Sequence, residues 1–194
     1  MGDSLFLIDL NLYLEECCRC GNYSLLNSLC TAMNISIKNL YFDNDDSILH
    51  RCIQWNNRQL TSELIRYGFN IDIDGEIGSP LVTAIHYDIL WAVEFLLNHG
   101  ADLTKRHIDW PLLTLYQYCI QFKKIDTKLI IDRYIALLIR QNNDVVLRKL
   151  INDGWNISLK RRRYHHHHCR LKKLDAYDHE KTKRREKSEK KTFL

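Results

Sequence analysis

The stretch SPLVTAIHYDILWAVEFLLNHGADL, residues 79–103, predicts two short helices joined by a turn. Ser79 is suited to cap the first helix, and Pro80 fits its first position, where a missing N–H costs nothing. Asp88 marks the turn, and Gly100 is suited to end the second helix as a left-handed cap. Each helix spans about ten residues or fewer, too few for stability alone in water. The unit is therefore expected to bury its apolar faces against similar units.

A copy of this unit precedes it in the chain at a constant offset. SILHRCIQWNNRQLTSELIRYGFNID, residues 47–72, aligns without a gap to residues 79–104. The matched positions are a capping serine, apolar helix positions and a turn glycine: Ser47 with Ser79, Leu49 with Leu81, Cys52 with Ala84, Leu64 with Leu96, Ile65 with Leu97 and Gly68 with Gly100. A repeat whose length is the interval from Ser47 to Ser79 is typical of solenoids built from stacked supersecondary units.

The repeated unit resembles the ankyrin repeat. SPLVTAIHYD…AVEFLLNHGADL is similar to that family's T-P-L-H-x-A…L-L-x-x-G-A-D pattern, with Ser79 in place of Thr and Val82 in place of His. SILH keeps His50 but has Ile48 in place of Pro. Residues 21–36 resemble a second half-repeat whose glycine has become Met33, residues 110–119 a first half, and residues 142–158 a second half.

The resemblance implies an all-α solenoid over residues 1–158, followed by a basic tail over residues 159–194. Four units are expected, over residues 5–40, 41–74, 75–105 and 106–158. The regular spacing fails in the last unit. The sequence separation between Gly100 and Gly154 is much longer than that between Gly68 and Gly100. Either one repeat has a lengthened helix, or a partial repeat is inserted near residues 126–141.

The charge of the 194-residue chain is unevenly placed. Residues 158–194 carry 14 Lys and Arg against 5 Asp and Glu, whereas the rest of the chain carries 14 against 19. The chain has seven cysteines, an odd number, and we expect no signal peptide before them. Both observations favour a reducing compartment, the cytoplasm or the nucleus, and argue against a disulfide framework. The apolar runs are too short for a membrane span.

The candidate metal and catalytic motifs are weak, so no cofactor, small-molecule substrate or enzymatic activity is expected. NIDIDGEIGSPL, residues 70–81, imitates a calcium loop but has Leu81 where a bidentate Glu is needed. ECCRC, residues 16–20, lacks the spacing of a zinc site, and YHHHHC, residues 164–169, predicts opportunistic metal binding. Cys119 and His107 could in principle pair, but no third orienting group is apparent.

The tail contains basic blocks of the length used for nuclear import or nucleic-acid binding. Its candidate residues are Lys160, Arg161, Arg162, Arg163, Lys183, Arg184 and Arg185. The alternative is a solvated charge run that only keeps the protein soluble.

The resemblance implies that a partner binds the concave side, formed by the hairpin tips and the first helices. Trp55, Tyr87 and Tyr118 follow Cys52, Ala84 and Leu115 by three residues, which predicts a ladder of outward aromatic rings. The positions just before them are Gln54, His86 and Gln117, and the candidate tip residues are Asp46, Glu76, Arg106 and His107. The alternative is that the rings pack between helices. Two acidic tips followed by a basic one predict a partner with a patterned surface, or a contact with the tail.

These observations predict a non-catalytic module for protein–protein interaction. One finer hypothesis is an inhibitor of host or cellular signalling, because small ankyrin proteins include viral mimics of the inhibitor of NF-κB. The other is a nuclear adaptor that binds nucleic acid through its basic tail.

Overall fold

The computed structural model describes the backbone of residues 2–42 and 44–155, and the side chains of residues 11–38, 40–42 and 44–155. The described elements are α1 (Gly2–Cys20), α2 (Tyr23–Ala32), the 3-10 helix η1 (Ile37–Asn39), α3 (Ile48–Gln54), α4 (Arg58–Arg66), α5 (Pro80–His86), α6 (Leu90–Asn98), α7 (Leu115–Gln121), α8 (Ile125–Arg140) and α9 (Asp144–Asn152). Within these residues the only β pairings are two isolated bridges, Tyr41 to Ser47 and Gly75 to Gly78. The expected all-α solenoid is confirmed.

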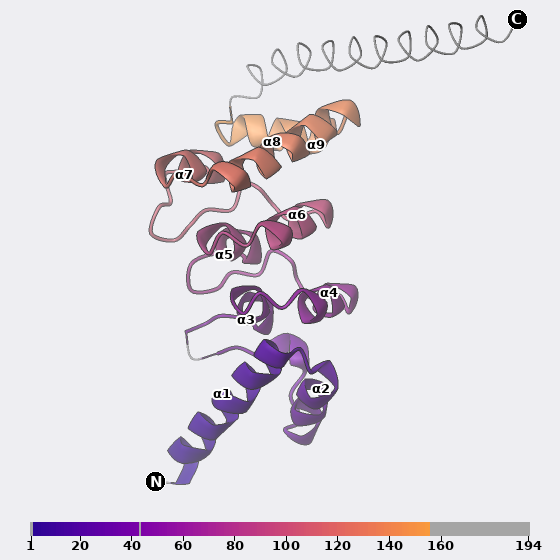
Figure 1. Cartoon of the computed structure of the whole chain (residues 1–194), viewed down its shortest axis with the longest axis vertical. Coiled ribbons are helices and arrows are strands. Elements are labelled where there is room, and N and C mark those ends of the chain that lie inside the picture. The colour runs from indigo at the N-terminus through magenta and orange to yellow at the C-terminus, as the bar shows by residue number, and fades with distance from the viewer. Residues whose placement is uncertain (1, 43, 156–194) are drawn as a thin grey trace, which may run out of the picture.

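The helical hairpins are stacked along the longest axis of the molecule, with α3, α5 and α7 in one column and α4, α6 and α8–α9 in the other (Figure 1). The loops that connect successive hairpins project from the side of the α3–α5–α7 column. The apolar core follows the stack, and Leu49, Leu64, Leu81, Leu96 and Leu115 are fully buried in it. Because α3 to α7 are only two to three turns long, their stability comes from this packing.

Every hairpin makes the same turn between its two helices. The turn residue has a positive φ angle, and the next N–H donates to the carbonyl oxygen five residues earlier. The turn residues are Gly21, Asn56, Asp88, Lys123 and Asn142, and the N···O distances are 3.2, 2.8, 2.9, 2.8 and 3.0 Å in that order. The predicted turn at Asp88 is confirmed. Five turns of one geometry therefore define five helical hairpins in the described part of the chain.

The second helices of four hairpins also end alike. Positive φ angles occur at Asn34, Gly68, Gly100 and Gly154, and the following N–H again bonds five residues back. The prediction that Met33 replaces the first of these glycines is wrong, because Met33 has φ −85° and Asn34 takes the left-handed position. Asn tolerates this conformation better than other side chains, since its short amide can bond locally.

The irregular spacing after Gly100 has its cause in α8, which belongs to two hairpins. Its first half pairs with α7 after the turn at Lys123, and its last turns precede the Asn142 turn and pair with α9. These two turns are much closer in sequence than the earlier successive turns at Asn56 and Asp88. Residues 126–141 are therefore the end of one repeat and the start of the next, joined in a continuous helix without the usual connecting loop.

Some expectations concern residues that the structure does not describe. The candidate import and nucleic-acid residues from Lys160 to Arg185, and the His-rich segment 164–169, lie outside the described residues. In the described residues no helix combines the length and the hydropathy needed to cross a bilayer.

Candidate protein-interaction surface

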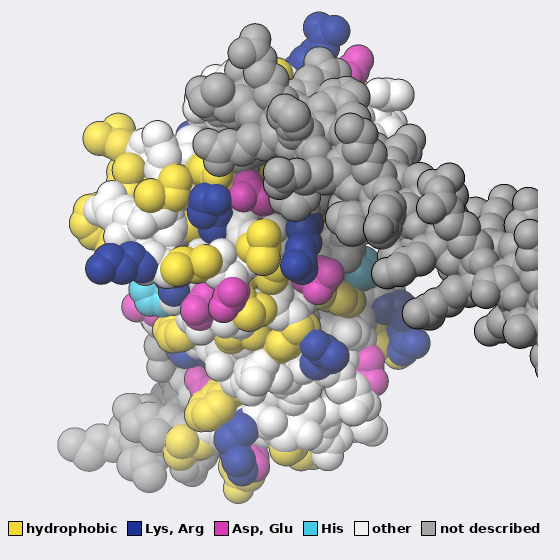
Figure 2. All heavy atoms as spheres, turned by 45° about the horizontal axis from the view of Figure 1, so that its top comes forward, with side chains coloured by type: hydrophobic (Ala, Val, Ile, Leu, Met, Phe, Trp, Pro, Cys, Tyr) yellow, Lys and Arg dark blue, Asp and Glu magenta, His cyan; other side chains and the backbone are white. Residues whose placement is uncertain are grey.

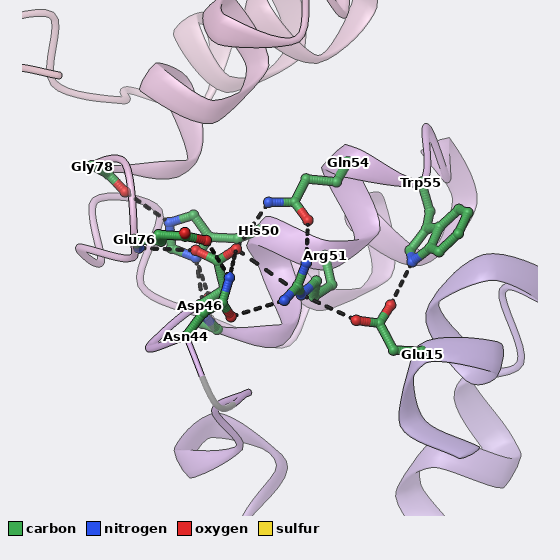
Figure 3. A network of polar contacts seen from close by, with 10 residues as sticks. Glu15, Asn44, Asp46, His50, Arg51, Gln54, Trp55, Glu76 and Gly78 are labelled. Carbon is green, nitrogen blue, oxygen red and sulfur yellow. Dashed lines mark hydrogen bonds and ion pairs between the residues drawn. The ribbon is translucent and has the colours of Figure 1, made fainter. Parts of the chain in front are cut away.

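The first two connecting loops are joined by a buried polar network around Asp46 (Figure 3). Asp46 is fully buried; one carboxylate oxygen accepts from Gln54 Nε2 at 2.8 Å, and the other accepts from the Glu76 N–H at 3.0 Å. The exposed Glu76 carboxylate accepts a bond from Asn44. Placing Asp46 at an exposed tip is therefore wrong, and Gln54 points toward Asp46 instead of away from the solenoid. Both residues hold neighbouring repeats in register.

His50 is the buried partner of this network. Its Nδ1 accepts from the Ser47 N–H at 3.1 Å, so the ring proton lies on Nε2, which donates to the Gly78 carbonyl oxygen at 3.0 Å. Burial lowers the pKa of His50, and the Asp46 carboxylate opposes this shift. The neutral imidazole thus connects the start of α3 to the next loop.

The later loops are linked by ion pairs between repeats. Lys105 Nζ lies 2.9 Å from Asp74, and Arg106 pairs with Asp153 beyond α9. Asp102 accepts from Lys149 at 2.5 Å. The acidic and basic tips that were predicted to face a patterned partner therefore neutralise each other along the solenoid, at least in part.

The predicted aromatic ladder is in the wrong register at its last member. Tyr118 is only 4% exposed, whereas Trp55 and Tyr87 are 47% and 51% exposed. Trp55 and Tyr87 are the residues that cap the C-termini of α3 and α5, and the equivalent residue of α7 is Phe122, which is 40% exposed. The error came from matching Leu115, instead of Cys119, to Cys52 and Ala84.

A capping box that begins at Thr114 is the sequence signal that identifies the correct repeat register of α7. Thr114 caps α7, and its N–H donates to Gln117 Oε1 at 2.8 Å while the Gln117 N–H donates back to its hydroxyl at 3.2 Å. This T-x-x-Q capping box starts α7 three positions later than the interval from Ser47 to Ser79 predicts. Gln117, although exposed, is thus committed to the start of its own helix.

A continuous series of ring contacts extends from α5 to the loop before α7, and we name it the aromatic surface. Its members are Tyr87, His86, His107, Tyr118, Phe122 and Trp110. The centroid distances between successive rings are 5.0, 5.2, 5.1, 4.5 and 5.3 Å. His107 and Tyr118 are buried at its centre, whereas His86 and the outer rings are exposed. Trp110 and Phe122 were missed from the sequence.

Exposed aliphatic side chains adjoin the aromatic surface in the chain. Ile108, Leu112 and Ile120 are 56%, 93% and 55% exposed. Figure 2 shows hydrophobic side chains gathered over α7 and the loop before it, at the upper left of the view. Exposed apolar groups that gather in this way mark interaction sites more often than isolated ones do.

The imidazoles of the aromatic surface are held neutral. Loss of hydration lowers the pKa of His86, and the nearby Lys124 ammonium lowers it further. Loss of hydration and the His86 ring likewise lower the pKa of His107. Cys119, which could have paired with His107, is buried in the core, and burial raises the pKa of its thiol to about 12. A thiol with this pKa is a poor nucleophile.

The described residues contain no metal-ligand cluster, and the hollow between α6 and α8 is small. Within this part of the chain, no three His, Cys, Asp or Glu side chains converge as metal ligands would. The hollow, of about 120 Å³, is lined by Glu94, Arg133 and Tyr134 among others. Ligand pockets usually exceed about 300 Å³.

Comparison with known proteins agrees with the fold. A family model for ankyrin repeats (3 copies) matches residues 14–107, from α1 to the loop before α7. The chain is an ankyrin-repeat protein. Ankyrin repeats form protein–protein interaction modules and are generally non-catalytic. The merged repeats of α7 to α9 lie beyond the matched segment.

The chain is also similar to an ankyrin repeat protein of fowlpox virus (strain NVSL). The two are 25% identical over 114 residues, which cover 58% of this ankyrin-repeat chain and 26% of the viral protein. The chain therefore spans about a quarter of the length of that relative.

Proposed function

We propose that this ankyrin-repeat chain binds a protein partner through the aromatic surface. It acts by occupying a binding site of that partner, without catalysis. The observation that carries the proposal is the series of ring contacts from Tyr87 to Trp110. The buried His107 and Tyr118 rings contact His86 and Phe122, and these two rings in turn contact Tyr87 and Trp110. Because each exposed ring already packs against another ring, it loses little freedom when a partner arrives. Aromatic anchors of this kind dominate the energetics of protein interfaces.

A substitution in the outer rings should weaken binding strongly. The probe is a peptide selected at pH 7.5 from a phage-displayed library on the full chain. We expect Trp110→Ala to weaken its binding at least about tenfold, because truncating an interface anchor commonly costs more than about 1.4 kcal/mol. Isothermal titration calorimetry measures the change, and circular dichroism checks that the fold is retained.

Tyr67→Ala is the matched control. Tyr67 is 47% exposed and stacks on Tyr23 at 4.8 Å, but it caps α4 in the other column of helices. This variant should bind the peptide as the unchanged chain does. If Tyr67→Ala abolished binding and Trp110→Ala did not, the binding face would be elsewhere.

The finer proposal is that the target belongs to a signalling pathway of a host or of the cell itself, which the chain inhibits competitively. The likeness to a fowlpox virus protein supports a host target. A reporter assay in transfected cells tests this proposal. The unchanged chain should lower a pathway's output and the Tyr87→Ala/Trp110→Ala variant should not; equal effects of both would contradict inhibition through this surface.

The alternative is a nuclear adaptor that binds RNA or DNA through the tail, with the chain located in the nucleus as well as the cytoplasm. The excess of Lys and Arg over residues 158–194 supports it. Binding through phosphate contacts weakens steeply with salt, so titrating salt against a labelled duplex tests this function. Absence of binding at low salt would exclude it.

A further inference from the structure

The imidazoles of His86 and His107 are in direct contact at the centre of the aromatic surface. His86 Nδ1 lies 3.0 Å from His107 Nε2, and the Tyr118 hydroxyl lies 3.2 Å from the same His86 nitrogen. The Asp109 N–H lies 3.2 Å from His107 Nδ1. Positions far apart in sequence are thus bridged by a chain of hydrogen bonds between α5 and the loop before α7.

The positions of the ring protons follow from these partners. The Asp109 N–H can only donate, so His107 Nδ1 is the acceptor and the proton of His107 is on Nε2. That proton is donated to His86 Nδ1, which therefore carries none. His86 must then hold its own proton on Nε2. Among the described residues nothing accepts this second proton, so His86 Nε2–H is left as a donor for a partner.

A further proton on either ring breaks this chain. Protonation of His107 Nδ1 sets its new N–H against the Asp109 N–H, and protonation of His86 Nδ1 sets an N–H against the Nε2–H of His107. Two donors then face each other at hydrogen-bond distance. In addition, the two cationic rings would repel each other within one cluster.

The charged groups around the pair do not remove this conflict. Lys124, in the turn between α7 and α8, donates to the His86 carbonyl oxygen at 2.9 Å and opposes a positive imidazole. Asp109 is the acidic group that favours protonation, but its carboxylate is 74% exposed and 3.9 Å from His107 Nδ1. Tyr118, on α7, is buried and its pKa is raised, so it stays neutral. The neighbouring tip cations Lys105 and Arg106 are already paired with carboxylates.

We propose that the His86–His107 pair makes binding at the aromatic surface pH-sensitive: the neutral pair holds the rings in the binding arrangement, and acid disrupts it. This inference rests on the proposed function and names the regulation of the same site. Both pKa values are lowered from 6.5, so the unfolded chain takes up protons first as pH falls. The stabilisation is complete above pH 6.5 and is lost as pH falls through the lowered values.

Nitrogen-15 NMR of the imidazoles in the full chain tests the arrangement without any partner. We expect both rings as Nε2–H tautomers at pH 7.5, and both to titrate below 6.5. In His86→Ala the pKa of His107 should rise toward its ordinary value, because the repelling ring is gone. His99→Ala, in which an exposed imidazole at the end of α6 is removed, should leave both titrations unchanged. Nδ1–H tautomers, or independent titration at ordinary values, would overturn the inference.

The peptide selected at pH 7.5 then tests the consequence for binding. If only the neutral pair binds, affinity falls at least about tenfold for each pH unit below the pKa at which the pair takes up its first proton. Constant affinity while the imidazoles titrate would overturn the pH dependence and leave the proposed function intact. If Trp110→Ala bound the peptide as tightly as the unchanged chain, the proposed function would fail, whatever the NMR titration gave.

Discussion

Asp46→Ala is expected to lower the free energy of unfolding by about 3–5 kcal/mol. The Asp46 carboxylate is fully buried, and it accepts from Gln54 and from the Glu76 N–H. It also faces Arg51, whose Nε lies 4.0 Å away. Truncation leaves these part-buried donors without an acceptor, and a partly buried guanidinium without one of its counter-charges. Such uncompensated groups cost more than the original bonds contributed.

Urea denaturation followed by circular dichroism measures this loss. Asp74→Ala is the matched control, because Asp74 also pairs with a cation but is 67% exposed, and exposed ion pairs contribute about 1 kcal/mol or less. Hydrogen exchange should show the loss first in α3 and in the loop before α5, since repeat arrays open locally. A cost for Asp46→Ala no larger than that for Asp74→Ala would contradict the role of the network.

Gly78→Ala is expected to be the second most damaging change, at about 3 kcal/mol, since backbone strain of this kind costs up to that amount. Gly78 has φ +129°, a conformation that side chains rarely permit, and a Cβ there would lie 2.7 Å from the Arg106 carbonyl oxygen. The loop cannot simply move away. The Gly78 carbonyl accepts from His50, and the Ile108 N–H bonds to Ile77 at 3.1 Å.

Gly100→Ala separates strain from collision. Gly100 has φ +88°, but a Cβ there would meet nothing within 4 Å, so this variant should cost only about 1–2 kcal/mol. Thermal unfolding compares the two variants. Because Arg106 precedes His107, the His107 imidazole signal should also shift in Gly78→Ala and not in Gly100→Ala. Equal losses of stability would contradict the close contact between the two loops.

The regular part of the fold was predictable because its signals are local. Ser47 and Ser79, Leu64 and Leu96, and the two repeat glycines specify a cap, an apolar face and a stop within each unit. The sharing of α8 was not predicted, although residues 126–141 contain no Gly or Pro that would break a helix. A lengthened helix was one of the two alternatives left open for these residues, and α8 is such a helix. That its two ends belong to successive repeats was not foreseen.

The aromatic surface was only partly predictable. The exposure of Trp55 and Tyr87 followed from the repeat, but Phe122 was missed because α7 begins three positions later than the repeat period predicts. The contact of His86 with His107 depends on how one loop packs against the preceding helix, and no local pattern records that distance. Likewise, acidic residues in a loop normally indicate exposure to solvent. The burial of Asp46 depends on tertiary packing, which the local sequence does not record.

Hydrogen–deuterium exchange of the full chain, with and without the selected peptide at pH 7.5, tests the central claim most directly. The account predicts that the peptide slows exchange around residues 86–88 and 107–122, and that this protection disappears when the pH is lowered until both imidazoles are protonated. Protection confined to α4, α6 or α9 would contradict the account, because those helices belong to the other column of the stack from α5 and α7 (Figure 1).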